Sequence, residues 1–229
     1  MAFKGFSKKG IKFLKDLEKN NTKVWFELNR YIWEKEIKQI NEEFVNEMGE
    51  TLQILVPSIN YKAKVSGSLF KIYRDIRFSK DKTPMKDKIG LIFWQGNAHR
   101  MQSSSFYMHY TKDTYFIATG IRNFKPEILK KYRLYLKNET KRIELYNILE
   151  NLKEKGYKLP PKKFKNIPKV LSDYKEDIHI DLSTYGAIFA FEEFKIDKTF
   201  YTLNIVDRCF KVYSDMKDLQ EWVYKMTLS

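Results

Sequence analysis

The sequence predicts an α+β fold, in which a long N-terminal helix and C-terminal helices pack on a central, mostly antiparallel sheet. Two observations indicate this class. Strand-like segments gather in the middle of the chain, whereas helical patterns occupy both ends. The loops between the strand-like segments are also too short for the crossover helices that parallel strands require. The 229 residues, 43% of them hydrophobic, are enough for a single domain over residues 1–229 with a sizeable core.

The N-terminal helices are expected over residues 7–55. Ser7 begins a helix that stops at Asn20. Thr22 is a suitable cap for a second, longer helix, whose apolar residues recur every three or four positions until Pro57 ends the run.

The sheet region is expected over residues 62–120, with a late strand near 185–194. Its strand-like segments are rich in β-branched and aromatic residues: SLFKIYRD (68–75), IGLIFW (89–94), SSFYMHY (104–110) and TYFIATG (114–120). The three residues Thr111, Lys112 and Asp113 form a plausible hairpin loop between the last two segments.

The remaining helices are expected over residues 125–156 and 198–226. Pro126 fits the first turn of a helix. The next helix, 139–154, carries apolar residues at Ile143, Tyr146, Leu149 and Leu152. The final stretch reads as one helix, and the proline-rich segment between the two regions, KLPPKKFKNIPKV, is expected to be irregular.

Positive charge is concentrated in two parts of the chain. The formal net charge is +14, from 43 basic and 29 acidic residues. Residues 62–88 hold nine basic and three acidic side chains, and residues 122–175 hold sixteen basic and six acidic ones. Such focusing creates a local field that attracts phosphates or polyanions. The alternative is a solvated surface that is simply rich in lysine.

The composition argues against a membrane protein and against a disulfide-bonded one. No apolar run approaches the ~20 residues needed to span a bilayer, and no apolar segment follows the basic N-terminus as in a signal peptide. The single cysteine, Cys209, excludes an intramolecular disulfide and is expected to be a buried packing residue. A reduced, cytoplasmic setting is the simplest expectation.

The segment KIYRDIRFSKDKTPMKDK, residues 71–88, is the best candidate site, because it passes from an ordered element into a polar, basic loop. Arginine offers a planar fork of donors that suits phosphate or carboxylate, and lysines add point charges. The candidate anion-binding residues are Arg74, Asp75, Arg77, Lys80, Asp81 and Lys82. The alternative is an internal Arg–Asp cluster that fixes the loop to the sheet.

This segment resembles the signature of a widespread bacterial family of unknown function. That signature has an initial arginine, an Arg-Asp-x-Arg-Phe core, an Asp-Lys or Asn-Lys pair and a terminal tyrosine. The matching residues are Arg74, Asp75, Arg77, Phe78, Asp81 and Lys82. Lys71 stands in place of the first arginine and Met85 in place of the tyrosine, so this chain has neither the guanidinium nor the phenol of the signature at those two positions.

The resemblance extends over nearly the whole chain. NNTKVWF near the N-terminus is similar to a family block with two asparagines and Trp-Phe, and LPPKKF with IPKVLSDYK is similar to a late proline-rich segment. The resemblance implies that Asn21 and Trp25 belong with the signature residues, Phe78 among them. It implies no particular activity.

Other patterns that carry chemistry are weaker. The three histidines, His99, His109 and His179, lack the spacing of a metal site, and no P-loop, GxGxxG or GxSxG motif occurs. Tyr107, Tyr110, Tyr115 and Phe116 could stack on bases, although core packing is the commoner role at strand spacing.

The leading hypothesis is a protein that binds a phosphate-bearing ligand, with nucleic acid favoured. A second is a metal-dependent phosphoesterase or nuclease that uses Asp75 and Asp81, or Asp181 and Glu193 with Lys195. A third is a non-enzymatic module whose Arg–Asp cluster is an internal brace. The sequence names neither a cofactor nor an oligomeric state.

Overall fold

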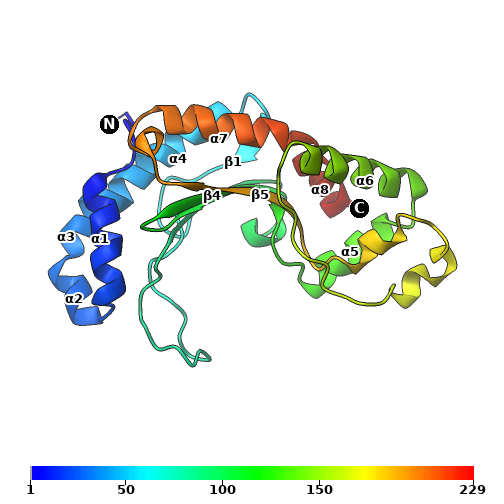
Figure 1. Cartoon of the computed structure of the whole chain (residues 1–229), viewed down its shortest axis with the longest axis horizontal. Helices are drawn as coiled ribbons and strands as arrows, with labels where there is room; N and C mark the ends of the chain where they lie inside the picture. Colours follow the sequence, from blue (N-terminus) through cyan, green and yellow to red (C-terminus); the bar gives the residue numbers. More distant parts are fainter. Residues whose placement is uncertain (1) are drawn as a thin grey trace. The chain divides into compact units, whose positions relative to one another are not determined.

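The computed structural model describes residues 2–229 and confirms the α+β class (Figure 1). The chain divides into two compact units. The first contains the residues up to Phe93 together with Tyr107–Ile117 and Glu193–Lys211, and the second contains Trp94–Phe106, Ala118–Glu192 and Val212–Ser229. The single domain over residues 1–229 stays a prediction.

Five strands form one antiparallel sheet whose spatial order follows the sequence. They are β1 (Ile59–Asn60), β2 (Ile89–Gln95), β3 (Ser105–Tyr110), β4 (Thr114–Ile121) and β5 (Ile188–Lys195). The expected hairpin loop joins β3 to β4, where the Thr111 amide donates to the Thr114 carbonyl at 2.8 Å. The segment SLFKIYRD is not a regular strand. It makes isolated bridges, from Leu69 to Leu91 and from Tyr73 to Met85, and leaves the sheet at that point.

The N-terminal helical run is interrupted where one long helix was expected. Its elements are α1 (Lys8–Lys19), α2 (Lys23–Leu28), α3 (Arg30–Ile32), the π-helix η1 (Trp33–Lys38) and α4 (Gln39–Leu52). Ser7 caps α1, and the expected Thr22 cap of α2 is present, its hydroxyl accepting from the Trp25 amide at 3.2 Å. A break at Asn29 separates α2 from α3, because its side chain bonds back to the Trp25 carbonyl.

Side chains along β3 point alternately to the two faces of the sheet, and those on one face form part of the core of the first unit. Met108 and Tyr110 are buried, and the Tyr110 ring lies 5.3 Å from that of Phe200. The Asn41 amide of α4 donates to the Tyr110 hydroxyl at 2.7 Å. Cys209 is fully buried against Met108, as expected of a packing residue, and burial raises the pKa of its thiol.

The part of the chain after β2 contains more helical elements than expected. They are α5 (Pro126–Tyr135), α6 (Glu139–Glu154), the short 3-10 helices η2 (Arg100–Gln102), η3 (Lys169–Tyr174), η4 (Ile180–Thr184) and η5 (Lys198–Tyr201), α7 (Asn204–Asp215) and α8 (Lys217–Leu228). The single helix expected over residues 198–226 is therefore three elements. Pro126 occupies the first turn of α5 as expected. No helix within residues 2–229 is long and apolar enough to cross a membrane.

The buried face of α6 differs from the expected one. Ile143 and Tyr146 are 39% and 37% exposed. The buried stripe consists of Arg142, Leu145, Leu149 and Leu152. Leu149 and Leu152 are therefore buried as expected. At the start of the helix the buried face begins with the charged Arg142, which is why an apolar pattern alone selected Ile143 and Tyr146 there.

Candidate functional site

The segment 71–88 forms a basic loop, which we call the signature loop (turquoise in Figure 1). Its neck is closed by backbone bonds, from the Arg74 amide to the Pro84 carbonyl and from the Lys86 amide to the Ile72 carbonyl, both 2.8 Å. Ile72 and Met85 are buried at the neck, whereas the tip, residues 75–83, is mostly exposed. The loop is thus a hairpin-like projection with an anchored base.

Arg74 braces the loop from within. Its guanidinium donates to the Asp81 carboxylate and to the Thr83 hydroxyl, and its side chain is 26% exposed. Asp81 also accepts from the Thr83 amide at 2.9 Å. The Thr83 backbone and hydroxyl, followed by Arg74, hold the pKa of Asp81 at about 2, well below its ordinary value. The group therefore stays charged at physiological pH.

Arg77 faces solvent at the tip. Its guanidinium pairs with the neighbouring Asp75 through two bonds of 2.9 and 2.8 Å, and its side chain is 76% exposed. The bonds from Arg77 lower the pKa of Asp75 to about 2. Since both members are exposed, this pair can open to admit another anion at little cost.

Phe78 stands beside Arg77 and is the most exposed large apolar side chain in the described residues. It is 94% exposed, and the Arg77 guanidinium carbon lies 5.8 Å from its ring centroid. Nothing in the fold requires an aromatic ring at this position. Lys82 donates to the Ile76 carbonyl at 3.0 Å and supports the same turn, while Lys80 is exposed.

The N-terminal block holds the neck of the loop, in agreement with the grouping that the resemblance implied for Asn21. The Asn21 side chain donates to the Met85 carbonyl and accepts from the Met85 amide, both at 3.0 Å. Phe26 is buried, and its ring lies 5.5 Å from that of Tyr73. Trp25 is only half-buried and points elsewhere.

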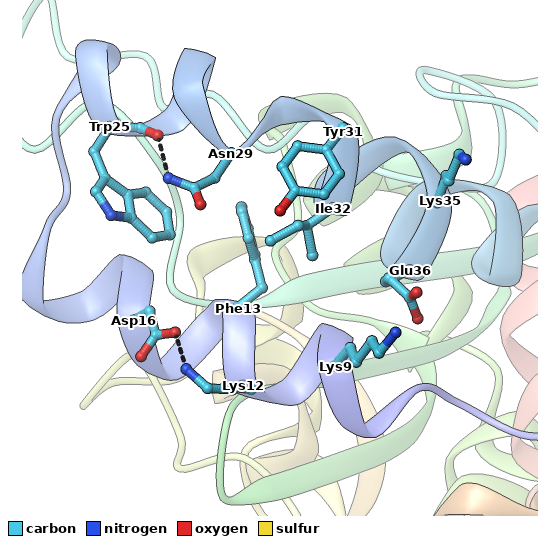
Figure 2. Close-up of a pocket in the computed structure, with 10 residues that line it drawn as sticks. All are labelled: Lys9, Lys12, Phe13, Asp16, Trp25, Asn29, Tyr31, Ile32, Lys35 and Glu36. Atoms are coloured by element: carbon cyan, nitrogen blue, oxygen red, sulfur yellow. Dashed lines mark hydrogen bonds and ion pairs between the residues drawn. The ribbon is translucent and has the colours of Figure 1, made fainter.

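Trp25 lines a cavity of about 520 Å³ between α1, α2, α3 and the π-helix (Figure 2). The ring of Phe13 packs against that of Trp25, with 5.3 Å between the ring centroids, and Tyr31 lies across the cavity. The charged side chains that line it are Lys9, Lys12, Asp16, Lys35 and Glu36, with a formal net charge of +1. Lys12 pairs with Asp16 at 2.7 Å, and the Ser7 hydroxyl donates to the Glu36 carboxylate. The π-helix on its wall is a rare form that is frequent at functional sites.

A row of aromatic side chains continues from the neck of the loop across the second face of the sheet. The Lys86 ammonium lies 5.9 Å from the Phe70 ring, and the Phe70 ring lies 6.1 Å from that of Tyr107. The row continues through His109 to Phe116, whose rings stack at 4.8 Å. All four aromatic side chains are half-buried.

The absence of a side chain at Gly90 keeps space for this row. A Cβ there would come within 3.0 Å of the Tyr107 hydroxyl and 3.1 Å of the Phe70 ring. Tyr110 and Tyr115, the other two aromatic residues considered for base stacking, are buried in the core, which is the commoner role expected at strand spacing. Alternation of the side chains across the sheet separates the two pairs.

The carboxylates proposed for a metal do not gather. Asp75 and Asp81 each hold an arginine, Asp181 pairs with Lys162, and Glu193 accepts from Thr114 at 3.2 Å. Within residues 2–229, no three side chains among histidine, cysteine, aspartate and glutamate lie close enough to bind one metal ion. No described observation favours the phosphoesterase or nuclease alternative.

A family model described as "Conserved hypothetical protein (DUF2461)" matches residues 9–222. The matched range contains the N-terminal block, the signature loop and the late proline-rich segment. A search of curated proteins finds no match.

Proposed function

The chain belongs to the conserved hypothetical protein family DUF2461, and from that premise we propose that its signature loop binds phosphate-bearing polyanions, single-stranded nucleic acid in particular. The exposed Arg77–Phe78 pair at the tip carries this proposal. Arginine binds phosphate through its donor fork, and an exposed aromatic ring stacks on a base.

The charge of the loop supports the same function. Residues 71–88 hold seven basic and three acidic side chains. Of the acidic ones, Asp81 is engaged by Arg74 and Thr83 within the loop. Arg77 and Lys80 at the tip remain accessible to a ligand, so the outer part of the loop is positive toward solvent.

The half-buried row from Phe70 to Phe116 extends the surface on which bases would stack. Its first member lies 5.9 Å from the Lys86 ammonium at the neck, so the row begins beside a cationic group of the loop. Binding sites for single strands combine these two features, and they tolerate many sequences because every base has a stacking face.

The division of labour between the two arginines explains how one loop combines order with binding. Arg74 is largely covered and holds Asp81 and Thr83, whereas the guanidinium of Arg77 pairs with the exposed Asp75 and lies beside the exposed Phe78. The internal brace and the binding group are thus different residues. The third hypothesis, an internal brace, applies in this proposal to Arg74 alone.

The test is fluorescence anisotropy with a labelled single-stranded oligonucleotide at low salt. We expect Arg77→Met to weaken binding about tenfold or more, the typical worth of a hydrogen bond to a charged group. Phe78→Ala should weaken binding by about 1–3 kcal/mol if a base stacks on the ring. An abasic strand of the same length should bind Phe78→Ala and the wild type equally.

The matched control is Lys153→Met, which also removes one exposed charge from a neighbouring carboxylate pair. It should bind as the wild type does. Arg77→Met should melt within a few degrees of the wild type, because an exposed ion pair contributes within about 1 kcal/mol. Absence of binding at low salt, or equal binding by the three variants, contradicts the proposal.

A further inference from the structure

A second cavity lies in the other unit, beside α5, and is unrelated to the signature loop. Its volume is about 560 Å³, which is within the usual range for small-molecule sites. Helix α5 supplies one wall, and the segment around Lys163 and Val170 supplies another. Phe124, before the helix, completes the lining.

The charge of this cavity is of one sign. Lys130, Arg133 and Lys163 line it, and the lining residues include no carboxylate. None of the three takes part in an ion pair with another residue in the described range 2–229. The cavity by Trp25 is different in this respect, since two carboxylates line it.

Arg133 has unused donor capacity at this cavity. Its Nε atom is buried and has no hydrogen-bond partner among the described residues. The guanidinium carbon lies 4.7 Å from the ring centroid of Phe164. Burial lowers the pKa of Arg133, so its desolvation is not offset by a neighbouring anion. The guanidinium at the cavity therefore carries its charge without a paired anion, and an anionic ligand would supply one.

Lys163 is held toward the same place by the backbone. The amides of Lys163 and Phe164 donate to the Thr184 carbonyl at 3.0 and 2.9 Å. The Lys163 stem lies over Gly186, where an added Cβ would come within 2.2 Å of its Cδ. Its ammonium lies 5.7 Å from the Phe164 ring, the ring that Arg133 also covers. The two cations are therefore placed around one aromatic ring.

The rest of the lining is apolar. Phe124 is buried and Leu129 is half-buried, while Leu134 and Val170 are 44% and 40% exposed at the cavity. An inorganic ion would leave this apolar surface in contact with water. A ligand with both an anionic head and an apolar body would satisfy both parts of the lining.

We propose that this cavity binds an amphipathic organic anion, whose negatively charged head meets Arg133 and Lys163 and whose flat apolar body lies against Phe124, Leu129 and Val170. The ligand class is a carboxylate, sulfonate or phosphate monoester with an aromatic body. The site is separate from the signature loop, so either proposal can fail without the other.

The probe for the test is 8-anilinonaphthalene-1-sulfonate, a flat organic anion that becomes fluorescent in apolar surroundings. Its uncharged relative N-phenyl-1-naphthylamine lacks only the sulfonate. We expect the sulfonate to bind the wild type, and Arg133→Met to weaken that binding about tenfold. The uncharged relative should bind weakly, and equally to both proteins. Arg30→Met, the same change at an exposed arginine of the other unit, should have no effect.

Two further measurements test whether the ligand needs an apolar body as well as an anionic head, and whether Arg133→Met still folds. Inorganic phosphate should compete with the sulfonate only at far higher concentration. Arg133→Met should melt no lower than the wild type, because it removes an unpartnered buried donor. Equal sulfonate binding by the wild type and Arg133→Met, or equal binding of the charged and uncharged probes by the wild type, overturns the proposal.

Discussion

Two arginines three residues apart in the signature loop show how the surroundings of a side chain decide its role. Arg74 reaches across the loop to Asp81 and Thr83, and is one quarter exposed. Arg77 bonds to Asp75, two residues away, and is three quarters exposed. The first contact closes the loop. The second can be exchanged for a ligand, because its loss leaves no buried group unpaired.

The pKa of Asp75 depends on Arg77, and this dependence provides a test of the pair in solution. Asp75 has a pKa of about 2, against an ordinary value of 3.8, with the Arg77 side-chain bond as the largest cause. Its ionised form is favoured in the fold, so the contribution to stability is complete above pH ~4 and is lost as the pH falls through about 2.

We therefore expect Arg77→Met to raise the pKa of Asp75 toward 3.8. The pKa of Asp81 should not change, because its causes are Thr83 and Arg74. Carboxyl carbon shifts measured by NMR between pH 1.5 and 6 would give both values. If the two aspartates shift together, the pairs are not independent.

At the scale of the element, the signature loop depends on a clamp from the N-terminal block. Asn21 makes both of its bonds to one residue, Met85, which is buried at the neck. The side chain of the neighbouring Asn20 donates to the Asp16 carbonyl of its own helix, at 2.9 Å. Two adjacent asparagines thus have a long-range and a local role.

We expect Asn21→Ala to destabilise the protein by about 1–3 kcal/mol, because it removes two hydrogen bonds and leaves backbone groups of Met85 unpaired. Hydrogen exchange at the Met85 amide should become faster. Asn20→Ala is the matched control and should leave that exchange rate unchanged. Equal effects of the two changes on Met85 would show that the clamp does not form in solution.

A second brace, in the other unit, involves the buried Arg142 of α6. Its guanidinium donates to the carbonyls of Leu136 and Lys137, at 2.6 and 3.0 Å, and pairs with Asp177. The ring of Tyr174 lies 5.1 Å from it. The Arg142 side chain thereby supplies hydrogen-bond donors to the carbonyl groups at the end of α5 and joins that end to the segment around Asp177.

Replacing Arg142 with Met should cost about 3–5 kcal/mol of unfolding free energy, since it leaves Asp177 and two carbonyl groups without their partner. Urea unfolding would measure this loss. Arg77→Met, at an exposed pair, should cost under about 1 kcal/mol in the same experiment. A similar small loss for Arg142→Met would mean that water or another residue replaces the brace.

At the scale of the whole molecule, local patterns predicted the fold class, the hairpin between β3 and β4, the Thr22 cap of α2 and the place of Pro126 in the first turn of α5. These features depend on neighbouring residues or on periodic burial. The burial of Arg142 and the cavity beside Arg133 depend on distant partners. The break at Asn29 involves a side-chain bond to Trp25, four residues away, which the apolar periodicity does not show. Arg142 had one visible signal, because it extends the Leu145–Leu149–Leu152 stripe by one turn.

The candidate loop was found from charge and resemblance, but the role of each residue was not. Sequence placed Arg74, Arg77 and Lys82 together without showing that the first and third bond within the loop. It also gave no sign that Phe78 would be exposed, since an aromatic residue after a strand-like segment more often packs in the core.

The concentration of charge in the loop leads to a prediction about salt. The loop has a net charge of about four, which would neutralise about four phosphates of a single strand. The affinity of the protein for that strand should then fall roughly 50-fold between 50 and 200 mM salt. Anisotropy titrations across that range would measure the slope. Arg77→Met should reduce the slope by about one phosphate contact. A flat profile would contradict binding through phosphates.

The π-helix at Trp33–Lys38 gives the chain a tolerance to a change in length. Each π-helical bond spans one residue more than an α-helical bond. Deleting Lys35 would therefore allow an ordinary α-helix to form there. The side chains of α4 would keep the directions in which they now point. Deleting Glu43 within α4 would instead rotate the residues after it by about 100° and turn Phe44 out of the core. Shortened relatives that lack one residue here should keep the core and lose only the shape of the cavity beside Trp25.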